Sequence, residues 1–147
     1  MKRILGLLLL AGVGMAGAPP KPSEAMTYYV QIVQGTDEAK PRDPKWKPIG
    51  PKLSERLATV FRWNHYWEVS CQPVSVARAK PAKIRVTPER EVEILLLNDK
   101  ESEVRLYRNG RPARKSRQSI RDKMTIMGWD KEKAEAWFVV VRTEKPQ

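Results

Sequence analysis

The most apolar stretch of the chain lies near its C-terminal end, where residues 136–141 (AWFVVV) show neither polar alternation nor helical spacing. β-Branched and aromatic residues pack well on a pleated surface, and a continuous apolar run is typical of a strand covered on both faces. A buried helix is the alternative, but the run has only about half the length that a helix usually needs. The pattern therefore predicts an interior strand that the rest of the chain must cover.

Much of the remaining chain alternates between apolar and polar residues with a period of two, which indicates half-buried strands. Turn signals separate these segments about every 8 to 12 residues, a spacing typical of a β-sandwich or a small barrel. The clearest alternating or apolar segments are residues 27–34, 65–71, 82–87, 92–97 and 103–108. The predicted fold is therefore mainly β, an antiparallel sandwich or small barrel.

One amphipathic helix interrupts this pattern, over residues 51–62. Pro51 fits the first helical turn, where its missing N–H costs nothing. The side chains predicted to face the core are Leu53, Leu57, Val60 and Phe61.

Asn109-Gly110 predicts a tight hairpin, because the type I′ turn needs two residues with positive φ. The returning arm, residues 111–119, is polar and contains Pro112. Proline cannot donate a ladder hydrogen bond, so this arm is expected at the edge of a sheet.

The first residues have the pattern of a secretory signal peptide. Lys2 and Arg3 precede an apolar run over residues 4–15, and small residues follow at 16–18. The apolar run is shorter than the roughly 20 residues that span a bilayer, so no transmembrane span is expected once the signal is removed. An uncleaved signal anchor is the alternative. The protein is therefore expected in the periplasm or outside the cell.

We expect residues 1–18 to be the signal peptide, residues 19–26 a flexible Pro-rich lead-in and residues 27–147 one β-rich domain. Pro19 directly after Ala18 suits the signal peptidase poorly. Cleavage after Ala16 or after Ala25 is the alternative.

Export makes the single cysteine informative, because an oxidising compartment favours paired cysteines and Cys71 has no partner within the chain. The sequence predicts that Cys71 is a small buried apolar residue. A disulfide to another protein is the alternative.

No catalytic or metal-binding group is predicted. His65 and Cys71 could resemble a base and a thiol, but six residues of strand separate them by about 20 Å. One histidine and one cysteine cannot build a Cys/His zinc site. A carboxylate pair of Glu68 and Glu93 has no support in the pattern. We therefore expect no enzyme and no cofactor.

Charge gives the main functional signal. The chain carries a formal charge of +11, and basic residues concentrate in and after the hairpin arms. The candidate anion-binding residues are Arg105, Arg108, Arg111, Arg114, Lys115, Arg117, Arg121 and Lys123. Arginine favours bidentate contacts with carboxylate or phosphate, whereas a charged edge strand that only prevents aggregation is the alternative.

Aromatic residues offer a second, weaker candidate, a stacking platform of Trp63, Tyr66 and Trp67. In general style the chain resembles small exported bacterial β-domains attached to envelope assemblies. The predicted function is non-enzymatic binding of another envelope component through the basic hairpin edge. The alternative is binding of an anionic polymer, a glycan or less plausibly a nucleic acid, through arginine and aromatic contacts.

Overall fold

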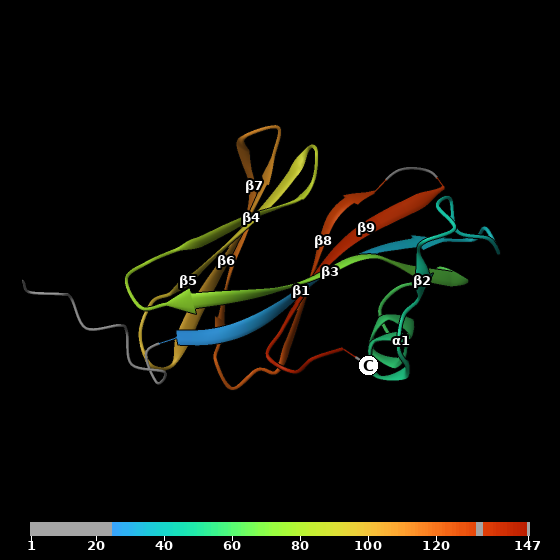
Figure 1. The fold of residues 1–147 in the computed structure, drawn as a ribbon. Coiled ribbons are helices and arrows are strands. Elements are labelled where there is room, and N and C mark those ends of the chain that lie inside the picture. The colour runs from blue at the N-terminus through green and yellow to red at the C-terminus, as the bar shows by residue number, and fades with distance from the viewer. Residues whose placement is uncertain (1–24, 132–133, 147) are drawn as a thin grey trace, which may run out of the picture.

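The computed structural model describes residues 25–131 and 134–146, so the predicted signal peptide and most of the lead-in lie outside the described residues. Two antiparallel sheets pack on each other in a mainly β, sandwich-like fold with a single short described helix (Figure 1). The predicted fold class is confirmed. The predicted division of the chain into signal, lead-in and domain stays a prediction.

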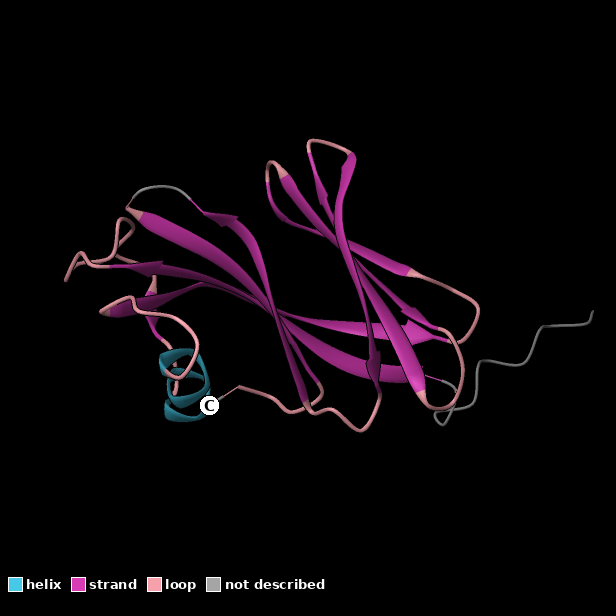
Figure 2. Cartoon of the chain, turned by 180° about the vertical axis from the view of Figure 1, so that it is seen from behind, coloured by secondary structure: helices cyan, strands magenta, loops and turns pink. Residues whose placement is uncertain are grey.

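The larger sheet has five strands in the order β2-β3-β1-β9-β8, and the smaller has four in the order β4-β5-β6-β7. The five are β1 (Ala25–Thr36), β2 (Lys47–Pro48), β3 (His65–Ala77), β8 (Met124–Lys131) and β9 (Glu135–Arg142). The four are β4 (Ala82–Thr87), β5 (Arg90–Leu96), β6 (Glu101–Arg108) and β7 (Arg111–Ser119). The helix α1 (Pro51–Ala58) packs on the larger sheet, on the side away from the smaller one (Figure 2).

Strand β9 is covered on both faces, as its apolar run predicts. Val139 and Val141 belong to the core between the two sheets, while Phe138 and Val140 belong to a second core beneath α1. All four side chains are almost inaccessible to solvent. The position of β9 between β1 and β8 explains why the sequence there shows no alternation, since neither face of the strand meets water.

The helix is shorter than predicted. Leu53 and Leu57 are buried in the second core, as expected, but the helix ends at Ala58. Val60 is 70% exposed, so its predicted place in the core is wrong. Phe61 does pack inward, with its ring centroid 4.4 Å from that of Phe138. The chain leaves the helical path after Ala58, which moves Val60 off the apolar face while Phe61 still reaches the sheet.

A β-bulge at Val69 overturns the predicted burial of Cys71. Ile32 pairs with Ser70 but Val33 pairs with Glu68, so Val69 is an extra residue in β3. An extra residue reverses the alternation beyond it. Val69 therefore packs against the core between the sheets, whereas Cys71 is turned to the outside and is exposed.

Strand β1 continues through Gly35 to Thr36, beyond the segment 27–34 that the sequence pattern predicted. The indole of Trp63 lies against Gly35, and a Cβ at this position would meet Trp63 Cδ1 at 2.7 Å. Glycine at this position therefore makes room for a packed aromatic ring rather than for a turn.

Two substitutions test the end of α1. Leu57→Ala should lower the free energy of unfolding by about 2–5 kcal/mol, because it leaves a cavity in the core beneath the helix. Val60→Ala should change it by less than about 0.5 kcal/mol, because this side chain faces water. Urea unfolding measures both. A loss at Val60 comparable to that at Leu57 would instead support the longer helix.

Candidate functional site

The β6–β7 hairpin forms as predicted. Asn109 and Gly110 have φ values of 51° and 75°, and β7 is an edge strand of the smaller sheet. The Asn109 N–H donates to the Glu89 carbonyl at 2.8 Å, which joins this turn to that of the β4–β5 hairpin (Figure 1). Six of the eight predicted basic residues are thus placed on a hairpin whose tip lies beside a second hairpin, and Arg121 and Lys123 follow it in the chain.

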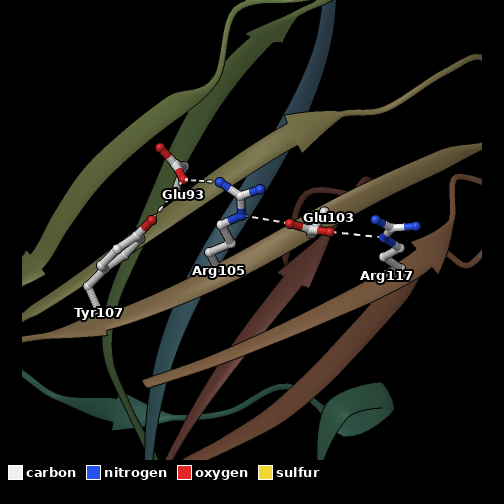
Figure 3. Close-up of polar contacts among 5 residues, drawn as sticks. All are labelled: Glu93, Glu103, Arg105, Tyr107 and Arg117. Atoms are coloured by element: carbon white, nitrogen blue, oxygen red, sulfur yellow. Dashed lines mark hydrogen bonds and ion pairs between the residues drawn. The ribbon is translucent and has the colours of Figure 1, made fainter. Parts of the chain in front are cut away.

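Two of the predicted anion-binding arginines are neutralised within the fold. Arg105 and Arg117 lie on the outer face of the smaller sheet, on either side of Glu103 (Figure 3). Arg105 Nε donates to Glu103 Oε1 at 2.6 Å, and Arg117 Nε donates to Glu103 Oε2 at 3.0 Å. These two arginines cover the Glu103 carboxylate, which is only 2% exposed.

The same network continues to β5. Arg105 Nη1 lies 3.4 Å from Glu93 Oε1, and the Tyr107 hydroxyl donates to the same oxygen at 3.1 Å. The hydrogen bonds from Arg105, and then from Arg117, hold the pKa of Glu103 below its ordinary value. This network links three strands across the sheet, and its charges are largely compensated.

Three further basic candidates are also separated from a common site. Lys123 Nζ pairs with Glu144 Oε1 at 3.1 Å, and Arg108 also has a partner in the chain. Arg121 follows the far end of β7, about 30 Å along an extended chain from the hairpin turn.

The remaining three, Arg111, Arg114 and Lys115, form what we call the tip cluster. They are exposed and close in sequence at the start of β7. None of them forms an ion pair with a described residue. Lys115 pairs with Arg105 and therefore lies on the outer face of the sheet, opposite to Arg114. The structure thus reduces the eight predicted residues to three that are close in sequence, exposed and without an ion pair among the described residues.

Arg114 connects the tip cluster to a cavity. It pairs across the ladder with Leu106, a core residue, and so faces the side on which the two sheets meet. Its Nη1 lies 4.0 Å from the position that a Cβ on Gly128 would take. Arg114 therefore reaches from the smaller sheet to strand β8 of the larger one.

The cavity has a volume of about 720 Å³ and lies between β8, β9 and the segment that follows α1. Its aromatic walls come from Phe61, Trp63, Trp129, Trp137 and Phe138. Its charged groups are Arg62, Arg114, Lys131 and Asp37. Three cations against one carboxylate, beside aromatic rings, suit an anionic ligand that also carries an apolar or ring surface.

The predicted aromatic platform is divided between two faces of the larger sheet. Trp63 and Tyr66 both pack over Gly35 on the helix side. Trp67, the neighbour of Tyr66 on β3, points to the opposite face and stacks on His65 with a centroid distance of 6.0 Å. Only Trp63 of the three lines the cavity.

Sequence reasoning missed Arg62, Lys131 and Gly128 as parts of this site. Arg62 was expected on a helix and is brought to the cavity by the chain beyond Ala58. Gly128 offered a signal, because an isolated glycine in a strand often marks a bulge or a close approach. The structure shows both, with a bulge between Gly128 and Asp130 and Arg114 above the glycine.

Compared with protein-family models, with curated proteins and with solved structures, the chain matches none. Among residues 25–131 and 134–146, no three His, Cys, Asp or Glu side chains gather as a metal site would require. In the same residues, no helix is long and apolar enough to cross a membrane.

The charged outer face gives a prediction for stability against pH. A carboxylate with a lowered pKa stabilises the fold above its unfolded pKa, about 4.3, and loses that effect as the pH falls through the folded value. Glu103→Gln should therefore destabilise the protein by about 1–3 kcal/mol at pH 7, and the difference from wild type should shrink below about pH 4. Thermal unfolding from pH 2.5 to 7 measures this. Glu101→Gln, at an exposed position of the same strand, should show little effect.

Cys71 gives a second prediction. Exposure should let iodoacetamide label it in the folded protein. Desolvation, and then the nearby charge of Glu68, raise the pKa of the thiol. The labelling rate should therefore rise with pH at a midpoint above the ordinary value of about 8.5, and Glu68→Gln should lower that midpoint. Labelling that occurs only after denaturation would restore the burial that the sequence predicted.

Proposed function

We propose that this protein is an exported, non-enzymatic domain of the bacterial cell envelope that binds an acidic partner through its basic hairpin edge. The signal-like pattern of residues 1–18 supports export. The overall charge of +11 favours an anionic partner. The tip cluster at the edge of the smaller sheet is the contact surface.

One observation carries this proposal, the unequal treatment of basic residues along one hairpin. Arg105 and Arg117 are matched by Glu103 within the sheet. The same hairpin also carries three exposed basic side chains that form no ion pair with a carboxylate of the described residues, namely those of Arg111, Arg114 and Lys115. A hairpin that balances some charges and leaves a group of others open is suited to an external anion.

Protection of an edge strand would also account for exposed basic residues. Arg114 argues for more than protection, because its side chain lies on the side where the sheets meet and lines a cavity with aromatic walls. A charge placed only to repel another sheet edge would have no reason to line that cavity.

The cavity favours a second candidate, an anionic glycan. Sugar rings stack on aromatic side chains, and the indole of Trp63 lies in the same cavity as Arg114 and Arg62. Carboxylate or sulfate groups on such a polymer would meet the guanidinium groups. Nucleic acid would use the same contacts, but an exported protein meets it less often.

The test uses two probes, polyglutamate for an acidic protein segment and heparin for an anionic glycan. Changing Arg111, Arg114 and Lys115 together to Gln should weaken binding about tenfold or more and flatten its dependence on salt. Titrations at several salt concentrations measure both effects. Stability should change by less than about 0.5 kcal/mol for each substitution, because all three side chains are exposed.

The matched control removes three other exposed positive charges, with Lys45, Lys80 and Lys100 changed to Gln. It has the same net charge as the hairpin variant and should retain most of the binding. Equal loss in both variants would mean that only net charge matters, and the proposal would fail. Trp63→Ala separates the two candidates, because it should weaken heparin binding much more than polyglutamate binding.

A further inference from the structure

Away from the hairpin, the larger sheet contains a buried positive charge that forms no ion pair with any described residue. Arg142 on β9 lies between Tyr29 of β1 and Met124 of β8, on the face that α1 covers. Its residue is only 7% exposed. A guanidinium in such a place is strongly unfavourable unless an anion or several acceptors meet it.

The contacts of Arg142 within the described chain are few. Nη1 donates to the side-chain oxygen of Gln31 at 3.3 Å, and Nε is buried without any acceptor. Gln31 in turn donates to Glu68 Oε2 at 2.7 Å, so the contact between Arg142 and this carboxylate runs through a neutral amide. Glu68 is also held by Lys47 at 3.5 Å. The guanidinium charge is therefore left largely uncompensated.

The first turn of α1 faces the same place. A cavity of about 80 Å³ is lined by Arg142 together with Gly50, Pro51, Lys52 and Leu53. The N-cap residue is Gly50, which has no side chain to cap the helix, and the first turn contains no acidic residue. Pro51 has no N–H, but the backbone N–H groups of Lys52 and Leu53 have no partner inside the helix, and such groups attract anions.

The remaining charged groups around this cavity leave it basic. Lys145 and Glu144 line it beside Lys52 and Arg142. Glu144 is already engaged by Lys52 at 3.6 Å and by Lys123 at 3.1 Å. One water needs roughly 10–15 Å³ of such space, so the cavity has room for a few waters or for one small oxyanion group.

We propose that the protein holds a single oxyanion group, a phosphate or a carboxylate, between Arg142 and the first turn of α1. The group would lie against the guanidinium and accept hydrogen bonds from the helix N–H groups, with Lys52 and Lys145 beside it. This site lies on the helix-covered face of the larger sheet and shares no lining residue with the hairpin cavity.

The experiment measures thermal unfolding of the full chain in rising inorganic phosphate or acetate, with chloride at equal ionic strength as the reference. One of the two anions should raise the Tm with the logarithm of its concentration above its dissociation constant, by about 3 °C or more at ten times that constant. Arg142→Met should abolish this response and should not lower the Tm in chloride, because it removes an unpaired buried charge without removing bulk. Lys115→Gln, which removes a charge from the tip cluster, should keep the full response.

A second variant keeps the test independent of folding at position 142. Lys52→Gln alters only an exposed side chain at the cavity and should weaken anion binding about twofold to tenfold in a direct titration. Vesicles then identify the source of the group. If the protein sediments more with vesicles containing phosphatidic acid than with phosphatidylcholine vesicles, and Arg142→Met reduces this difference, the bound group is a lipid headgroup. If the protein responds only to the soluble anion, the bound group is a free ion. No rise in Tm with either soluble anion beyond that in chloride, or an equal rise in Arg142→Met, would overturn the proposal.

Discussion

The whole architecture depends on the burial of strand β9 from both sides. A strand that shows apolar side chains on both faces must be covered twice, and no single sheet-to-sheet contact can do this. Trp137, Val139 and Val141 are covered by the smaller sheet, and Phe138 and Val140 by α1 with its neighbouring loops. The smaller sheet and the helix each cover one face of the same apolar run, residues 136–141.

This arrangement gives the two sheets different tasks. The larger sheet carries both cores, and where its helix-covered face must hold a polar residue, as at Arg142, that residue is buried. The smaller sheet contributes one apolar face and turns the other to solvent, where Glu103 and its arginines form a compensated network (Figure 3). Its edge strand β7 adds no residue to either core, and its first residues are exposed to solvent.

Local patterns in the sequence were enough to predict the fold class, the doubly covered strand, the start of α1 and the Asn109-Gly110 turn. Each of these depends on residues that are neighbours in the chain. The bulge at Val69 could not be predicted, because it depends on how β3 pairs with β1, and it alone reverses the side on which Cys71 lies. The exposure of Val60 was missed because the helix ends at Ala58, earlier than the apolar spacing suggested.

The candidate site also has one feature that the local sequence predicted and others that it did not. The basic character of the hairpin was visible in the sequence, but which arginines are neutralised depends on Glu103 and Glu93 across the sheet. The cavity joins residues from β7, β8 and the segment after α1, which are far apart in the chain. No local pattern could have brought Arg114, Trp63 and Lys131 together.

The central claim is that a stable core around β9 holds a separate binding surface at the start of β7. Hydrogen exchange of the folded protein, with and without heparin or polyglutamate, tests this claim most directly. Without ligand, β9 amides should exchange only on global unfolding, and those at the start of β7 should exchange much faster. On binding, protection should increase at Arg111 to Lys115 and in the nearby part of β8, while β9 stays unchanged. Unchanged β7 amides with saturating ligand, or protection gained only elsewhere, would contradict the account.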